Sequence, residues 1–260
     1  MTATIIENMS NAEYHSSSAI SKSGLDLIEK SPAHYFYADK EKTKAMVIGS
    51  AFHDLVLLPD VFEKIYAVKP EGLSLVTKEG KAWKAENEGK EILSQEEFDV
   101  INAMKESVLA HHSASKLLAQ GKAETSIFWT DESGVECRCR PDFIHSSGVI
   151  VDLKTTNDAS PKGFAKSVAE FRYHVQDAYY SNGYQHAFGE LPKGFVFIAV
   201  EKKPPYAVGV YTLDDAAKLE GETRFKENIE TYKQALEQGV WNAFSPKIET
   251  LSLPIWAYKQ

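Results

Sequence analysis

Two short stretches carry charged residues at positions that suit metal-assisted hydrolysis. They are Arg140-Pro-Asp-Phe-Ile144 and, ten residues later, Val151-Asp-Leu-Lys-Thr155. On adjacent antiparallel strands Asp142 and Asp152 come side by side, and Asp152 and Lys154 project from the same face of their strand. Two close carboxylates repel unless a divalent cation neutralises them, and Mg²⁺ or Mn²⁺ is the usual ion for phosphoryl chemistry. The pattern therefore predicts a metal site with a lysine beside it.

A simpler interpretation needs no site. Asp142 could lie at the end of a strand, and Asp152 and Lys154 could form a surface pair, because Asp-x-Lys triplets are common by chance. However, the rest of the run over 149–156 looks buried. Charges inside such a strand are costly unless they are partnered, so we favour the site.

The elements before these strands are predicted from hydrophobic periodicity to be helices. Apolar residues recur at helical spacing over 21–30, 33–38 and 43–58, and Pro residues follow or interrupt these runs. Ser94 and Glu97 form a capping box at the start of another helix. We therefore expect the N-terminal region to be mainly helical.

The period changes from residue 123 onward. Alternating residues predict strands over 123–129, 135–144 and 149–154, joined by turns into an antiparallel meander. A Ser-Pro pair at 160–161 starts a further helix. The remaining pattern predicts, in order, a helix over 173–188, a strand over 194–201, a strand over 208–213 and a helix over 214–239. This order indicates an α/β fold with a mixed central sheet flanked by helices.

Length and composition fit this fold. The chain has 260 residues, 29 Lys and Arg against 37 Asp and Glu, a formal charge of −8 and 43% hydrophobic residues, which is typical of a globular protein. We expect a single domain over 1–260, with a mainly helical part over 1–120, the catalytic sheet and helix over 121–215, and a C-terminal helix and tail over 216–260. The acidic balance argues against non-specific coating of nucleic acid, although a local basic channel is compatible with it.

The chain carries no targeting or redox signals. Its first residues lack the basic and apolar regions of a signal peptide, and no apolar run approaches the roughly 20 residues of a membrane helix. We therefore expect a cytoplasmic protein without membrane contact. Cys137 and Cys139 are badly placed to bridge each other and are interpreted as packing residues. Neither a disulfide framework nor an iron–sulfur cluster is expected.

Pro141-Asp142 followed by Asp152-x-Lys154 resembles the motif of PD-(D/E)XK nucleases. Gly49-Ser-Ala-Phe-His53 upstream and Gln176-Asp-Ala-Tyr-Tyr180 downstream are similar to motifs of the RecB-like branch. Stretches along nearly the whole chain also resemble the nuclease domains of RecE-like exonucleases (exonuclease VIII): 19–23, 124–129, 137–142, 173–180 and 251–256. The resemblance implies a restriction-endonuclease-like core and a phage-type exonuclease. Such an enzyme degrades linear double-stranded DNA from 5′ ends and leaves 3′ single strands for recombination and repair.

The resemblance also implies roles for individual residues. His53, Asp142 and Asp152 would bind the metal with their side chains, and Leu153 with its backbone carbonyl. Lys154 would be the catalytic lysine, which orients or deprotonates the attacking water and stabilises charge on the phosphate. The metal would be Mg²⁺, with Mn²⁺ as a substitute.

The helical residues of the site have simpler alternatives. His53 could be a satisfied core histidine, although Gly49, one turn earlier, would let its helix pack closely on the sheet and favours a ligand. Gln176 and Tyr180 lie at i and i+4 on one helix face and, by the resemblance, would brace the lysine or contact the DNA backbone. Without the family, a polar helix face with an aromatic half in the core explains them equally well.

Several residues receive looser predictions. Glu124 also matches a position of the family, and strand geometry allows it to be a hydrogen-bond partner behind the ligands. Contacts to DNA phosphates are considered for Ser21, Lys22, Ser23, Arg138 and Arg140. An N-cap serine explains the first of these as well, and exposed strand arginines often have no such role.

The expected partners follow from the resemblance. They are double-stranded DNA ends, further copies of the chain in a ring-shaped homo-oligomer, most simply a tetramer, and a single-strand annealing protein. One alternative is a nuclease-fold module that binds DNA ends without cutting, and another is a related nuclease of different polarity. A nuclease of CRISPR spacer capture is disfavoured, because the four spaced cysteines of iron–sulfur members are missing.

Overall fold

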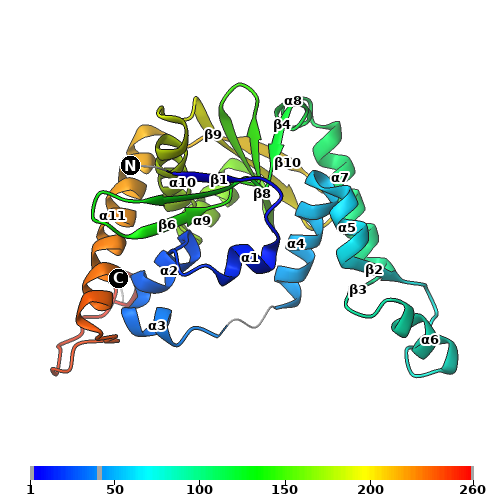
Figure 1. Ribbon diagram of the computed structural model, residues 1–260, viewed down its shortest axis with the longest axis horizontal. Coiled ribbons are helices and arrows are strands. Elements are labelled where there is room, and N and C mark those ends of the chain that lie inside the picture. The colour runs from blue at the N-terminus through cyan, green and yellow to red at the C-terminus, as the bar shows by residue number, and fades with distance from the viewer. Residues whose placement is uncertain (1–2, 40–42, 259–260) are drawn as a thin grey trace.

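The predicted catalytic strand lies at the centre of a mixed sheet in the computed structural model, which describes residues 3–39 and 43–258. The strand order is β10-β9-β8-β7-β4 (Figure 1). β8 pairs in parallel with β9 and antiparallel with β7, so the predicted mixed sheet is confirmed. The strands of this larger sheet are β4 (Gly121–Ala123), β7 (Phe143–His145), β8 (Val149–Thr156), β9 (Gly194–Glu201) and β10 (Val208–Tyr211).

The meander predicted before β8 is divided between two sheets. The strand expected over 123–129 breaks at Glu124, whose φ of 48° lies in the left-handed region. The strand expected over 135–144 breaks at Pro141, which has no N–H to donate to a ladder. The prediction of one continuous meander is therefore wrong. The separated halves form a smaller sheet of order β1-β5-β6, with β1 (Thr4–Ile6), β5 (Ser126–Thr130) and β6 (Glu136–Cys139).

Helices surround both sheets, and several agree closely with the prediction. The capping box is present, since the Ser94 hydroxyl accepts from the Glu97 N–H at 3.1 Å and the Glu97 carboxylate accepts from the Ser94 N–H at 2.8 Å. No helix in the described residues is long and apolar enough to cross a membrane. The helices are α1 (Asn11–Ser16), α2 (Lys22–Lys30), α3 (Pro32–Phe36), α4 (Lys44–Leu57), α5 (Pro59–Ile65), α6 (Lys78–Glu86), α7 (Gln95–Ala110), α8 (His112–Leu117), α9 (Pro161–Glu170), α10 (Tyr173–Phe188) and α11 (Asp215–Gln238).

The N-terminal region contains strands as well as helices. β1 joins the smaller sheet, and β2 (Tyr66–Lys69) pairs in parallel with β3 (Glu91–Ser94). The segment between β2 and β3 carries α6 and projects from the body of the molecule (Figure 1). These strands have only three or four residues, which is too short for an alternating pattern to be recognised.

Different helices cover the two faces of the larger sheet. On one face α4 and α7 form a hydrophobic cluster with Val151 and Leu153 of β8. On the other face Ile150 belongs to a cluster that includes residues of α9, α10 and β9. Because side chains alternate along a strand, Asp152 and Lys154 share this second face with Ile150. β8 therefore presents these charges toward α10.

Close packing of α10 on the smaller sheet fixes the position of this helix. A Cβ atom at Gly183 of α10 would lie 2.7 Å from the Trp129 ring and 2.8 Å from the Cys139 sulfur, so only glycine fits here without a shift of its neighbours. Cys137 and Cys139 are free and fully buried, and their interpretation as packing residues is confirmed.

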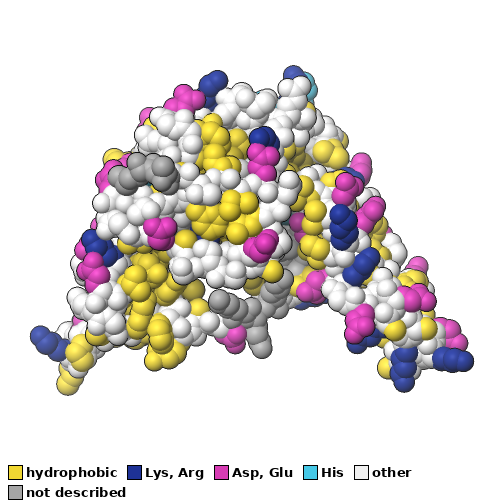
Figure 2. All heavy atoms as spheres, in the orientation of Figure 1, with side chains coloured by type: hydrophobic (Ala, Val, Ile, Leu, Met, Phe, Trp, Pro, Cys, Tyr) yellow, Lys and Arg dark blue, Asp and Glu magenta, His cyan; other side chains and the backbone are white. Residues whose placement is uncertain are grey.

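Apolar side chains gather at the surface where α3 and the segment after α11 lie (Figure 2). Phe36 and Phe244 are 55% and 74% exposed there. Trp241 stacks on Phe36 with ring centroids 5.2 Å apart. The segment after α11 contains one short 3₁₀ turn, Ile255–Ala257. This end of the molecule therefore presents apolar surface to the solvent.

Candidate active site

Two strand breaks bring carboxylates together beside α4. Glu124 follows β4 and Asp142 precedes β7, and the Glu124 N–H donates to the Asp142 carbonyl at 3.0 Å. His53 of α4 completes the group, so that one ligand atom from each of the three residues lies within 4.8 Å of the others. An imidazole nitrogen and two carboxylate oxygens suit a divalent cation, so these residues could hold a metal.

The Asp142 carboxylate is held from two sides. Its Oδ2 accepts the Leu153 N–H at 2.7 Å and lies 3.3 Å from the His53 Nδ1. Burial opposes ionisation of Asp142, but the charge of His53 and its hydrogen bond outweigh burial and lower the pKa of the carboxyl. Likewise burial lowers the pKa of His53, yet Asp142 raises it to about 9. A metal that binds here must therefore displace a proton from the imidazole.

Asp152 is completely buried and has two polar partners. Its Oδ1 lies 2.5 Å from the Lys154 ammonium, and its Oδ2 accepts a hydrogen bond from the Gln176 amide. Burial raises the pKa of Asp152, and the nearby Asp142 raises it further, against the charge of Lys154. Burial lowers the pKa of Lys154, but Asp152 and Asp142 outweigh it and raise the pKa. The lysine therefore stays an ammonium that balances part of the negative charge.

The structure brings His53 of α4 together with Asp142 and Glu124, and Asp152 is not part of this group. Metal binding by Asp152 therefore stays a prediction. Gln176 donates to the Asp152 carboxylate, which is the ion-pair partner of Lys154, and a direct role of Gln176 on the lysine stays a prediction. Tyr180 lies one turn further along α10 on the same side, where burial raises its pKa and Asp152 is among the neighbouring charges. Leu153 is connected to the site by its N–H, and metal binding by its carbonyl stays a prediction.

Two expectations about the site need correction or refinement. A Cβ at Gly49 would meet no atom within 4 Å, so close packing at this residue does not explain the position of His53. Strand geometry allows Glu124 to be a hydrogen-bond partner behind the ligands, but the structure puts its carboxylate among the candidate ligands. Burial raises the pKa of Glu124, and Asp142 raises it further. The left-handed break at Glu124 is a tertiary feature that no local sequence signal indicated.

Arg138 and Arg140 are buried, although the sequence predicts them to be exposed. Arg138 and Arg140 are each only 8% exposed, and both guanidinium groups lie over the Tyr14 ring, at 4.9 and 4.1 Å from its centroid. Arg138 donates to the Ser17 carbonyl at 2.5 Å, and Arg140 donates to the Asn11 side chain at 2.7 Å. These contacts tie the N-terminal segment to β6 and to the residue that follows it, and they account for both arginines without a phosphate. Binding of DNA phosphates by Arg138 and Arg140 stays a prediction.

Replacing Arg138 with Met is therefore expected to lower stability and leave DNA binding alone. Loss of a buried charged hydrogen bond costs about 1.5–3 kcal/mol, which thermal unfolding would detect. The salt dependence of binding to duplex DNA is the second measurement, because each lost phosphate contact reduces the slope of log K against log salt by about 0.9. If the Arg138→Met protein kept its stability but showed a smaller slope of log K against log salt, Arg138 would be a DNA-phosphate contact.

The segment that begins α2 has structural partners as well. Ser21 caps the helix, and its hydroxyl lies 3.0 Å from that of Ser23. The Lys22 ammonium lies 2.7 Å from the Asp26 carboxylate and donates to the Phe171 carbonyl at 2.7 Å. These contacts account for the residue types without a phosphate, whose binding at this segment stays a prediction.

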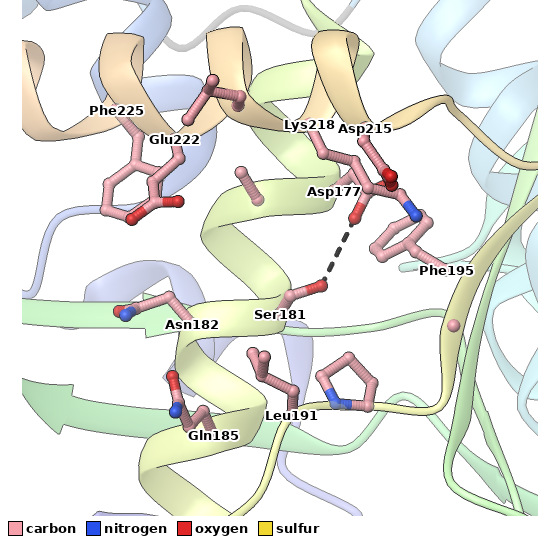
Figure 3. A pocket seen from close by; sticks show the side chains of 14 residues that line it. Asp177, Ser181, Asn182, Gln185, Leu191, Phe195, Asp215, Lys218, Glu222 and Phe225 are labelled. Carbon is pink, nitrogen blue, oxygen red and sulfur yellow. Dashed lines mark hydrogen bonds between the residues drawn. The ribbon is translucent and has the colours of Figure 1, made fainter.

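A hollow of about 440 Å³ lies on another side of α10, between α11 and the start of β9 (Figure 3). Asp177 and Ser181 face it from α10, joined by a 3.3 Å hydrogen bond, and Lys218 faces it from α11. None of the candidate metal ligands lines this hollow. Asp177 is buried, with a pKa raised to about 6 mainly by burial. The hollow is therefore separate from the candidate active site.

Comparison with known proteins gives a family and a fold. A family model described as a PDDEXK-like domain of unknown function (DUF3799) matches residues 21–254. A crystal structure from Eubacterium rectale, described as "Putative exonuclease", superposes with a TM-score of 0.68 at 14% identity over 96% of this chain and 97% of the other. No curated protein matches the sequence. The mixed sheet with flanking helices is thus a restriction-endonuclease-like fold, as predicted.

Proposed function

This chain belongs to the family of PDDEXK-like domains DUF3799, and from that premise we propose that it is a Mg²⁺-dependent exodeoxyribonuclease acting on linear double-stranded DNA. One observation carries the proposal: the candidate ligand group of His53, Glu124 and Asp142 lies beside the ion pair that the buried Asp152 forms with Lys154. Metal ligands next to an ammonium group suit metal-assisted hydrolysis of a phosphodiester, because both the cation and the ammonium stabilise the negative charge that develops on the phosphate.

The residues of the site would have three different roles: binding the metal, stabilising charge on the phosphate, and orienting a carboxylate. His53, Glu124 and Asp142 would hold the metal, with Asp152 beside them, and the metal would supply Lewis-acid stabilisation and a more acidic water. Lys154 keeps its proton, because neighbouring carboxylates raise its pKa. This direction supports stabilisation of negative charge on the phosphate, in preference to action as a base, as the role of Lys154. Gln176 orients the Asp152 carboxylate that holds the lysine.

The proposal also includes the polarity of digestion, that is, the strand end from which the DNA is degraded. The resemblance to RecE-like exonucleases supports degradation from 5′ ends, which leaves 3′ single strands for a single-strand annealing protein in cytoplasmic DNA recombination. An end-binding module that does not cut is the competing function. The presence of a whole set of candidate ligands with a paired lysine favours the enzyme, since a non-cutting module would have no need of them.

Digestion of duplexes labelled at one end tests activity and direction together. Linear DNA with a label on either the 5′ or the 3′ end is incubated with Mg²⁺, and closed circular DNA serves as the control. We expect early release of the 5′ label as short products, shortening of the 3′-labelled strand, and no cutting of the circle. Release of the 3′ label first would reverse the polarity, whereas no cutting in Mg²⁺ or Mn²⁺ would favour the binding module.

The net charge leads to an assembly proposal. A chain of charge −8 repels duplex DNA at long range, so a cationic surface must be concentrated where the DNA passes. A closed ring, most simply a tetramer, places such surfaces around one channel and encloses the substrate. Light scattering together with a trap-DNA chase measures both properties. We expect an oligomer that continues digesting its substrate after the trap is added, and a monomer that releases DNA after each cut would contradict the ring.

A further inference from the structure

An aromatic ring lies directly against the catalytic lysine. Tyr173 is the first residue of α10, and the Lys154 ammonium lies 4.7 Å from the centroid of its ring. The Lys22 ammonium approaches the same ring at 5.9 Å. The face of an aromatic ring attracts cations, most strongly where water is partly excluded. Lys154 is therefore held between the ring of Tyr173 and the carboxylate of Asp152.

The ring is itself held by its neighbours. It stacks on Phe197 with centroids 5.8 Å apart and planes at 26°, and on Phe171 at 5.7 Å and 29°. Phe197 lies on β9 directly beside Asp152 in the parallel ladder of β8 and β9. The surface that contacts Lys154 is thus anchored to the strand next to the one that carries the lysine. A ring in this setting does not move with the lysine.

A lysine needs such support because its side chain is long. Four flexible bonds carry a compact ammonium, and only a fixed environment selects one position for it. An ion pair with Asp152 alone would hold the ammonium close to the carboxylate. A ring face attracts the ammonium without accepting one of its strong N–H hydrogen bonds, so those donors are left for the substrate.

The positive charge of Lys22 restricts the movement of the Lys154 ammonium from a third side. Its ammonium is fixed by the Asp26 carboxylate and the Phe171 carbonyl, each at 2.7 Å. Like charges repel, so Lys154 is disfavoured from moving across the ring toward α2. The charge of Lys154 is also among the causes that lower the pKa of Lys22, after burial, which agrees with their proximity.

We propose that Tyr173 is a positioning residue for Lys154, whose aromatic face keeps the ammonium aimed at the reacting phosphate. The inference rests on the proposed nuclease function. The ring carries the effect, and the hydroxyl group does not. Removal of the ring is expected to lower the rate of the chemical step more than the affinity for DNA, since Tyr173 acts through the lysine.

The test compares three substitutions at one position. Tyr173→Leu and Tyr173→Met, which remove the ring, should lower kcat by roughly 5- to 30-fold with little change in KM. Tyr173→Phe, which keeps the ring, should stay within about 2-fold of the native kcat. Tyr211→Leu is the matched control, because Tyr211 stacks on Phe164 in the same aromatic cluster at 5.3 Å, whereas the ring that the Lys154 ammonium approaches is that of Tyr173. It should leave kcat unchanged.

Two activity results would overturn the proposal. One is an unchanged kcat in Tyr173→Leu, and the other is a Phe variant as slow as the Leu variant, which would assign the effect to the hydroxyl. In the first case, a raised KM beside the unchanged kcat would place the ring in substrate binding.

A second measurement does not depend on activity. The ring should shift the NMR signals of the Lys154 ε-methylene upfield, and these signals are identified by their loss in Lys154→Arg. In Tyr173→Leu the upfield shift should disappear, and in Tyr173→Phe it should remain. If the native protein cut no DNA, the nuclease function would fail while this measurement still decided whether Tyr173 holds Lys154. No upfield shift in the native protein would overturn the positioning role itself.

Discussion

Cleavage of linear duplex in Mg²⁺ is expected to fall by roughly 10³-fold or more when Asp142 is replaced by Asn. The carboxylate is central to the candidate metal group, since its Oδ2 lies beside the His53 imidazole and accepts the Leu153 N–H. Asn retains the shape and an acceptor oxygen for that N–H but loses the negative charge that a divalent cation requires. The fold should therefore persist while metal binding and activity are lost.

Calorimetric titration with Mn²⁺ and the end-labelled digestion measure the two losses separately. Asp177→Asn is the control, because Asp177 is a buried carboxyl on α10 that lines the separate hollow and is not in the candidate metal group. We expect this control to bind metal and to cut DNA like the native chain. Near-native cleavage by the Asp142→Asn protein in Mg²⁺ would show that the metal site has been assigned to the wrong residues.

The second large effect is expected at Lys154. Replacement by Ala should lower kcat by about 10²- to 10⁴-fold at saturating metal, because the ammonium no longer stabilises charge on the phosphate. Metal affinity should be kept or increased, since a positive charge 2.5 Å from the Asp152 carboxylate is removed. The Asp152 carboxylate would still accept the Gln176 hydrogen bond.

Single-turnover digestion over a range of Mg²⁺ concentrations separates rate from metal affinity in this variant. Circular dichroism checks that the chain is folded, because the variant leaves a buried carboxylate without its ion pair. If the variant needed more metal but reached the native rate at saturation, Lys154 would belong to the metal site and would have no role in charge stabilisation.

The sequence alone determined the elements whose signals are local. The capping box at Ser94, the Gly189 stop of α10 and the apolar run of β9 each predicted an element with bounds close to those observed. Alternation along β8 also predicted that Asp152 and Lys154 share a face, and they form an ion pair there. These features depend on residues a few positions apart, so the backbone geometry of a helix or strand is sufficient to derive them.

Only the tertiary structure decided how distant segments meet. Periodicity treated 123–129 and 135–144 as continuous strands, but β5 and β6 pair with β1 near the N-terminus, and the breaks place Glu124 beside Asp142. The sequence predicts Arg138 to be an exposed strand residue, but in the structure the segment around Tyr14 covers its side chain. Alternation predicts which face of a strand a side chain lies on, but it does not predict which segment of the chain covers that face. The covering segment is more than a hundred residues away in the chain, so the contacts that bury the arginine and assemble the ligand group arise only on folding.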